Sequence, residues 1–150
     1  MVPTSTLAQT SLFADLSDAQ LEKFAALAAE VAYAEGDTIF EEGAEACCLY
    51  ILLDGKVNIH TQLTSRPEKI SIAIINQPGR VIGWSGFLAE ARYTGSATCQ
   101  EASCLLEFDG PAFMQVLNDD PALGFIVMRR ITDVISNRLR NLQRFVLKTL

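Results

Sequence analysis

Turn-forming residues recur about every ten residues between Val31 and Phe108, and this spacing constrains the fold more than any other feature of the sequence. The turns include a Gly-Asp pair, a Glu-Glu-Gly triplet, an Asp-Gly pair and a Gln-Pro-Gly triplet. The segments between them are short, and they are either apolar throughout or alternate between apolar and polar residues, as strands do. Many short strands at this spacing predict a β-sandwich or a β-barrel.

One pair of strands is predicted most clearly. Residues 48–53 form an apolar run that is typical of a buried strand. The Asp-Gly pair at 54–55 favours a two-residue hairpin turn. The segment after it alternates, which places Val57 and Ile59 inward and the only histidine, His60, outward.

The sequence predicts helices before and after the strands. Ser17 is a suitable N-cap, and Gln20 at the third helical position completes a capping box, so a helix should run to about Glu30. Beyond the strands, Pro111 suits the first position of a second helix. A long helix is then expected from about Ala122 to Lys148.

The long helix carries a broad apolar stripe on one side. Its members are Val127, Met128, Ile131, Val134, Ile135, Leu139, Leu142, Phe145 and Val146. Arg138 falls inside the stripe, where it can reach a ligand pocket or form an ion pair. The stripe exceeds what a small β domain can cover, so we expect a homodimer formed through this helix.

Composition limits the class of protein. The 150 residues suit a single domain, and the net charge of -6 argues against binding of nucleic acid by this chain alone. No apolar run approaches the roughly 18 residues that span a bilayer, so we expect no membrane partner. Residues 1–10 predict a loose leader without the features of a signal peptide, which makes the cytoplasm the expected location.

Residues for catalysis or metal binding are not recognisable. We find no Ser-His-Asp set, no P-loop, and no Cys-x2-Cys spacing among the four cysteines. His60 alone cannot support a metal centre that needs several histidines. We therefore expect no enzymatic activity, no catalytic residue and no metal site.

Three segments carry a resemblance to a known family. They are Gly-Asp-Thr-Ile-Phe-Glu-Glu-Gly at 36–43, Leu-Tyr-Ile-Leu-Leu-Asp-Gly-Lys-Val at 49–57, and Gly-Arg-Val-Ile-Gly at 79–83. In order and spacing they resemble the cyclic nucleotide-binding domain, over roughly residues 12–146. The resemblance implies a mainly β fold with flanking helices: a double-stranded β-helix, or jelly roll, at about 31–108, an N-terminal helix and a C-terminal dimerisation helix at about 122–148.

The same resemblance implies a regulatory role. Catabolite-activator-like members share this β-roll and dimer helix, and a helix-turn-helix domain follows them. We expect residues 1–150 to be one domain without such a DNA-binding unit. Family members recognise the base partly from the long helix, which makes Asn141 and Gln143 weak candidates for ligand contacts.

The chain departs from the family at two positions that hold the ligand. Where the family has a glutamate that accepts a hydrogen bond from the ribose hydroxyl, this chain has Trp84, whose indole only donates. Where the family has an arginine for the cyclic phosphate, the aligned residue is Thr94 or Gly95, shortly before Ala97. Losing two charged hydrogen bonds, at roughly 1.5–3 kcal/mol each, should weaken binding by about two to four orders of magnitude.

The residues around the glycine-rich segment form the candidate ligand pocket. Trp84 can stack on a base or fill the empty pocket, and Arg92 can replace the missing cation or remain a solvated loop side chain. Ser85, Ser96 and the backbone N–H groups near Gly86 can hold a small anion. The candidate ligand-binding residues are Ile82, Gly83, Trp84, Ser85, Gly86, Arg92, Tyr93, Thr94, Ser96, Ala97 and Arg138.

These features lead to one expected function and two alternatives. We expect a non-enzymatic regulatory or sensor module in which binding of cAMP or cGMP is altered or lost, with a cyclic nucleotide or another small anion as the candidate ligand and no certain cofactor. One alternative is a ligand-free dimeric interaction protein whose own side chains fill the pocket. The other is the sensor part of a catabolite-activator-like transcriptional regulator.

Overall fold

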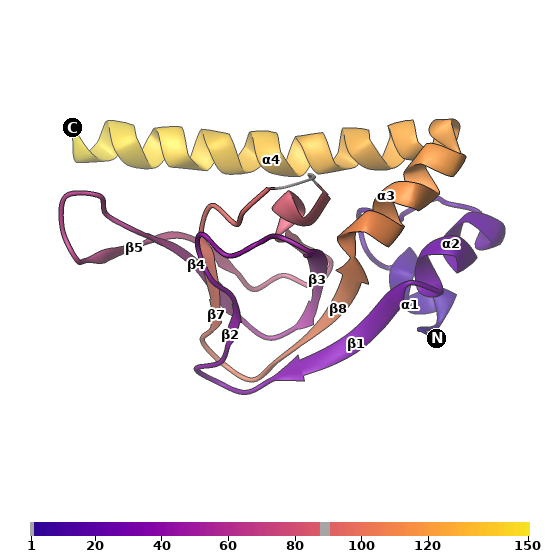
Figure 1. The fold of residues 1–150 in the computed structure, drawn as a ribbon, viewed down its shortest axis with the longest axis horizontal. Helices are drawn as coiled ribbons and strands as arrows, with labels where there is room; N and C mark the ends of the chain where they lie inside the picture. Colours follow the sequence, from indigo (N-terminus) through magenta and orange to yellow (C-terminus); the bar gives the residue numbers. More distant parts are fainter. Residues whose placement is uncertain (1, 88–90) are drawn as a thin grey trace.

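The computed structural model describes residues 2–87 and 91–150, which form a β-roll with short helices at one end and a long helix along one side (Figure 1). The elements in chain order are α1 (Thr4–Ala8), α2 (Asp18–Ala25), β1 (Ala28–Tyr33), β2 (Thr38–Phe40), β3 (Cys48–Asp54), β4 (Val57–Gln62), β5 (Lys69–Ile75), β6 (Val81–Ile82), the 3-10 helix η1 (Trp84–Phe87), β7 (Ser96–Cys99), β8 (Ser103–Asp109), α3 (Gly110–Asp119) and α4 (Pro121–Thr149). The mainly β fold with flanking helices that the sequence predicts is confirmed.

Two four-stranded sheets make up the roll. Their strand orders are β1-β8-β3-β6 and β2-β7-β4-β5, and the pairings within them are antiparallel. Inward-facing residues of both sheets form one core, in which Val57, Ile82, Ala97 and Leu105 are fully buried. Because successive residues of a strand point to opposite faces, Leu49 and Ile51 of β3 and Phe108 of β8 face the other way and are buried in a second core with the helices.

The turn at Asp54 and Gly55 joins the two sheets, so the predicted hairpin is wrong. β3 pairs with β6 and β8, whereas β4 pairs with β5 and β7. Gly55 has a φ of +116°, and a Cβ there would lie 2.6 Å from the Cα of Ser103. The Asp-Gly pair does make a tight turn, but its close packing against the start of β8 directs the chain into the other sheet.

Residues 2–10 pack against the rest of the domain, which contradicts the predicted loose leader. Leu7 in α1 is fully buried, and its backbone carbonyl accepts a hydrogen bond of 2.7 Å from the Thr10 hydroxyl. Leu12 and Phe13 continue into the main core. The sequence analysis missed this segment because α1 has only five residues, too few for a helical period to show.

The helix α2 begins as predicted and ends early. Ser17 and Gln20 form the expected capping box, with both reciprocal hydrogen bonds present. The helix stops at Ala25 and not near Glu30, because β1 starts at Ala28 and pairs with β8. Ala28, which the helical spacing included, therefore belongs to a strand, and tertiary pairing overrides that spacing.

A cluster of phenylalanines joins the helices to the roll. Phe13, Phe24, Phe108 and Phe113 are fully buried and contact one another, with ring centroids 4.7 to 6.1 Å apart. They come from the N-terminal segment, α2, β8 and α3, so this end of the molecule is held from four directions. Large aromatic side chains contribute most of the burial in such cores.

The long helix α4 crosses the whole roll, with its C-terminal end beside the hairpin formed by β4 and β5 (Figure 1). Asp120 caps it, accepting a hydrogen bond of 3.2 Å from the N–H of Leu123. Among the described residues, no helix is both long and apolar enough to cross a membrane.

Candidate ligand pocket

The glycine-rich segment turns sharply from β6 into η1. Gly83 has a φ of +77°, and a Cβ at this position would lie 3.1 Å from the Phe40 ring. A Cβ on Gly86 would lie 2.6 Å from the backbone carbon of Cys48. These glycines allow a close approach of groups from the protein itself, and not only of a ligand.

The space beside this turn is nearly full. It forms a cavity of about 30 Å³, which we call the roll cavity. Its lining residues are Phe40, Ile59, Gly83, Trp84, Ser85, Tyr93, Thr94, Gly95 and Arg138. About 10–15 Å³ of such volume holds one water molecule, whereas pockets for drug-sized ligands measure about 300–1,000 Å³. The roll cavity therefore has room for about two waters and not for a nucleotide.

Trp84 and Arg138 close one side of the roll cavity together. The guanidinium carbon of Arg138 lies 4.6 Å from the centre of the Trp84 ring, in cation–π geometry. The same guanidinium donates a long hydrogen bond of 3.5 Å to the carbonyl of Val81. Burial, and then the nearby charge of Arg80, lower the pKa of Arg138 to about 10, so it stays charged at neutral pH. Arg138 thus links α4 to β6 and η1.

Two stacked aromatic rings also line the roll cavity. Phe40 and Tyr93 are stacked with centroids 4.0 Å apart and planes 16° apart. The Tyr93 hydroxyl donates a hydrogen bond of 2.7 Å to the carbonyl of Cys48, which fixes the ring against β3. Burial raises the pKa of Tyr93 to about 12, so the hydroxyl remains a donor at neutral pH.

The structure brings only part of the candidate set together. Gly83, Trp84, Ser85, Tyr93, Thr94 and Arg138 line the roll cavity. Ile82 and Ala97 are instead fully buried between the sheets, and Gly86 packs on Cys48. Ser96 accepts a hydrogen bond of 2.8 Å from the N–H of Glu42 and lines a different hollow, on the outer face.

Arg92 does not replace the missing cation in this conformation. Its side chain is exposed and donates a hydrogen bond of 2.8 Å to the carbonyl of Gly43, on the loop between β2 and β3. The residue also forms a β-bridge with Glu45. Arg92 therefore fastens one loop to another and is not among the residues that line the roll cavity.

Sequence reasoning missed three lining residues. Ile59 was predicted to face inward, and Phe40 lies in the segment 36–43 that carries the resemblance, but neither was assigned to the pocket. Gly95 was considered only as the position aligned with the missing arginine. The closeness of Gly83 to Phe40 and Tyr93 comes from pairing between distant strands, which no local pattern reveals.

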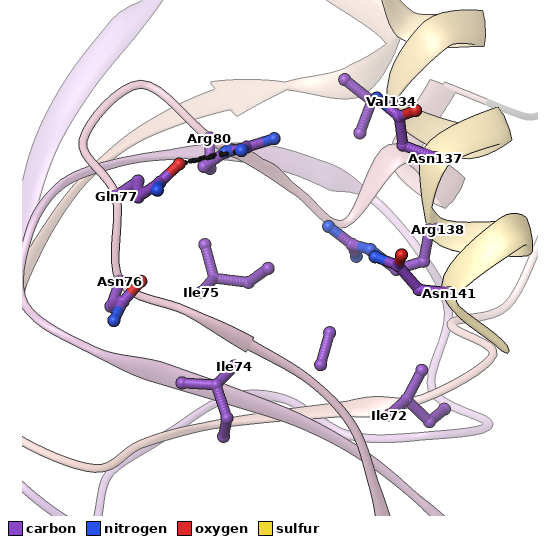
Figure 2. A pocket seen from close by; sticks show the side chains of 11 residues that line it. Ile72, Ile74, Ile75, Asn76, Gln77, Arg80, Val134, Asn137, Arg138 and Asn141 are labelled. Carbon is purple, nitrogen blue, oxygen red and sulfur yellow. Dashed lines mark hydrogen bonds between the residues drawn. The ribbon is translucent and has the colours of Figure 1, made fainter. Parts of the chain in front are cut away.

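A second and larger space lies between β5 and α4, and we call it the helix cavity (Figure 2). Its volume is about 280 Å³. Its lining residues are Ile72, Ala73, Ile74, Ile75, Asn76, Gln77, Arg80, Val134, Asn137, Arg138 and Asn141. In Figure 2, Arg138 and Asn141 extend from α4 toward the isoleucines of β5. Of the two weak candidates for ligand contacts on the long helix, Asn141 lines this cavity and not the roll cavity, and Gln143 lines neither.

Comparisons with known proteins agree with this architecture. The N-terminal domain of a transcriptional regulator from Streptomyces coelicolor is 27% identical, covers 94% of each chain and has a TM-score of 0.70. A cyclic nucleotide-binding domain from Methylobacillus flagellatus has a TM-score of 0.82 at 22% identity, covering 98% of this chain and 82% of that one. The sensor domain of the transcriptional regulator DNR from Pseudomonas aeruginosa has a TM-score of 0.74 at 22% identity, covering 91% of each chain. At 22% identity these last two likenesses show the fold alone.

A search of curated proteins found no match. The family model of the cyclic nucleotide-binding domain, in contrast, matches residues 30–120, which contain nearly all of the roll and α3. The matched residues contain most of the β-roll and the glycine-rich turn into η1, whereas the structural likenesses cover more than nine-tenths of the chain. The chain therefore belongs to the cyclic nucleotide-binding domain family.

Proposed function

We propose that this chain is a non-enzymatic regulatory module that does not bind cAMP or cGMP in the way usual for its family. One observation carries the proposal: Arg138 stacks on Trp84 and leaves only about 30 Å³ in the roll cavity. A nucleotide would have to displace both side chains before it could enter. The pocket is filled by the protein itself, which favours the reading of Trp84 as a filler over its reading as a stacking platform.

Electrostatics support the same proposal. A cyclic phosphate needs charged donors, but Thr94 and Gly95 line the roll cavity where the family's arginine is expected. Arg92, the nearest alternative in sequence, is engaged with the carbonyl of Gly43. Among the described residues that line the cavity, Arg138 is the one cation, and it is already in contact with Trp84.

Regulation would act through α4. Arg138 is attached to α4 but contacts η1 through Trp84 and β6 through the Val81 carbonyl. Any ligand or partner that moves Arg138 changes how the second half of α4 meets the roll. The helix would then have two arrangements against the roll, one with Arg138 on Trp84 and one with Arg138 displaced. A ligand that changes the populations of these two arrangements would act as a regulator.

The second half of α4 supports a homodimer. Ile135, Leu139, Leu142 and Val146 follow one another at spacings of four, three and four residues, as in the seam of a coiled coil. Leu139 is 56% exposed and Val146 50% exposed. In a homodimer, the apolar stripe of one α4 helix would be covered by the same stripe of the second copy, which matches it in shape and chemistry.

One specific observation favours a role as the sensor part of a transcriptional regulator. The Streptomyces coelicolor domain, at 27% identity over 94% of each chain, is the N-terminal domain of such a regulator. In that case the dimeric α4 would transmit the state of the roll to a further domain. The filled roll cavity and the proposed dimer seam are both compatible with a role as the sensor part of a transcriptional regulator.

A titration that compares the wild type with Trp84→Ala tests the proposal. Isothermal titration with cAMP should show that the variant binds at least as well as the wild type, because removing the indole opens the pocket. A variant that binds cAMP more weakly than the wild type would contradict the proposal, since Trp84 would then be a ligand contact. Thr132→Ala is a suitable control, because it removes an exposed side chain on α4 outside both cavities.

A further inference from the structure

The helix cavity combines an apolar floor with a polar wall. Ile72 and Ile75 come from β5, whereas Asn137, Arg138 and Asn141 come from α4. Figure 2 shows Arg80 across the space from Asn141, next to Gln77. An apolar surface with a few polar groups converging on it is the usual character of a site for a small organic molecule.

The charges around this cavity have one sign. Its lining contains two arginines and no carboxylate. In the part of the chain that the structure describes, the ion pairs are Lys23 with Asp120 and Arg66 with Glu68, so neither Arg80 nor Arg138 is neutralised by an acidic side chain. Two guanidinium groups that face a shared space repel each other, and an anion between them would relieve this repulsion.

The donors of Arg80 are only partly used. Its Nε and Nη2 donate to the side-chain carbonyl of Gln77, at 3.2 and 2.8 Å. Among residues 2–87 and 91–150, the Nη1 amino group has no hydrogen-bond acceptor, so it can serve a ligand. A shallower hollow of about 210 Å³ adjoins the cavity, shares Arg80, Asn137 and Asn141 with it, and adds Arg140 and Arg144. This density of positive charge stands out in a chain of net charge -6.

We propose that the helix cavity binds a small phosphate monoester, with Arg80 and Arg138 holding the phosphate and the isoleucines of β5 contacting an apolar or planar organic group. Two guanidinium groups from different elements can each present a fork of donors to the oxygens of a phosphate. Asn137 and Asn141 add neutral hydrogen bonds. The volume of about 280 Å³ suits a single phosphate with a modest organic group.

This site goes beyond the proposed function, because it lies outside the roll cavity, but the two share Arg138. A phosphate that recruits Arg138 competes with Trp84 for the same guanidinium. The hydrogen bond to the Val81 carbonyl, at 3.5 Å, offers little resistance to such a movement. Trp84 is the only tryptophan of the chain, so its fluorescence reports the change directly.

Isothermal titration and Trp84 fluorescence with two probes test the proposal. Inorganic phosphate should bind saturably, and phenyl phosphate should bind several-fold more tightly because its ring meets the isoleucines. Both probes should change the fluorescence of Trp84. Arg80→Ala should weaken phenyl phosphate binding by about tenfold or more, the loss expected for a charged hydrogen-bond donor.

Arg66→Ala is the matched control, because it removes the same charge from an exposed loop residue outside the helix cavity. It should leave binding within about twofold of the wild type, as a distant, screened charge does at 0.15 M salt. The proposal is overturned if neither probe binds saturably by about 20 mM, far weaker than a useful site. It is also overturned if Arg80→Ala binds like the wild type, if Arg66→Ala loses as much as Arg80→Ala, or if binding leaves Trp84 fluorescence unchanged. None of these results bears on whether the roll cavity admits cAMP, which the titration with cAMP tests separately.

Discussion

The two halves of α4 meet the rest of the domain in different ways. In the first half, Leu123, Val127 and Ile131 are at most 1% exposed and pack into the core beside the phenylalanine cluster. In the second half no residue is buried, and Leu139 is 56% exposed. The first half is anchored in the core, whereas the second half leaves apolar side chains exposed, as the proposed dimer and ligand response require.

Two arginines on α4 repeat this difference. Arg130 donates to the carbonyls of Leu12 and Ala14, at 3.0 and 2.7 Å, and so fastens the first half to the N-terminal segment. Arg138 makes one hydrogen bond of 3.5 Å and a cation–π contact with Trp84. Arg138, which lines both cavities, is therefore held less firmly than Arg130. A side chain that moves when a ligand binds must be held in this weaker way.

The largest expected effect concerns the dimer seam in the second half. Ile135→Asp should raise the dissociation constant of the dimer by about a hundredfold or more, because association would bury two unpaired carboxylates. Sedimentation velocity measures the outcome. Ile126→Asp is the control: it is the same change at an exposed position on nearly the opposite side of the helix, and it should leave the dimer intact. A dimer that survives Ile135→Asp would show that the interface lies elsewhere.

Matched leucine truncations compare the two halves directly. Leu123→Ala removes a fully buried side chain and should lower the free energy of unfolding by about 2–5 kcal/mol. Leu139→Ala should cost about 0.5 kcal/mol or less, as exposed positions do. Urea denaturation in the Ile135→Asp background removes the contribution of the dimer. Equal costs at the two positions would mean that the second half also packs on the roll.

The two arginines should also differ when replaced by methionine. Arg130→Met removes two good charged hydrogen bonds and leaves two carbonyls unpaired, so it should cost about 2–3 kcal/mol. Arg138→Met loses a long hydrogen bond and a cation–π contact, and the removal of a partly buried charge offsets part of this, so about 1 kcal/mol is expected. Chemical denaturation checks both values. A larger cost for Arg138→Met than for Arg130→Met would mean that Arg138 is the more firmly held of the two side chains, which would contradict its role as a contact that moves.

A modest loss of stability is expected at the filler of the roll cavity. Trp84→Ala should lower the free energy of unfolding by about 1–2 kcal/mol, less than the cost at a fully buried aromatic position, because Trp84 is only half-buried. Thermal unfolding followed by circular dichroism measures it. An unchanged midpoint would mean that the indole contributes nothing to packing and is held ready for a ligand.

The sequence predicted the elements with strong local signals. The capping box at Ser17 and the long α4 follow from local residue chemistry and period, and both are confirmed. The α1 helix and the early end of α2 could not be predicted, because a short helix has no period and β1 is specified by its pairing with β8. The role of Gly55 likewise depends on its contact with Ser103, a residue distant in the sequence.

Within the candidate site, Gly83 was predicted, whereas Gly86 does not line the roll cavity and Gly95 was not assigned to it. The side-chain contacts could not be predicted. The departure at Trp84 from the family pattern already suggested a filled pocket. The position of Arg138 over Trp84 depends on how α4 lies against the roll, which the apolar stripe alone does not fix. Arg80 gave no sequence signal, because its significance comes from facing the same cavity as Arg138.

Titration of the purified wild-type protein with cAMP by calorimetry tests the central claim most directly. The account predicts no saturable heat up to about 1 mM ligand, because the roll cavity is filled and Trp84 and Thr94 or Gly95 stand where the family has its charged ligand contacts. Saturable binding with a dissociation constant of about 1 μM would contradict it, since the protein would then open the contact between Trp84 and Arg138 at little cost and bind the nucleotide as a working sensor.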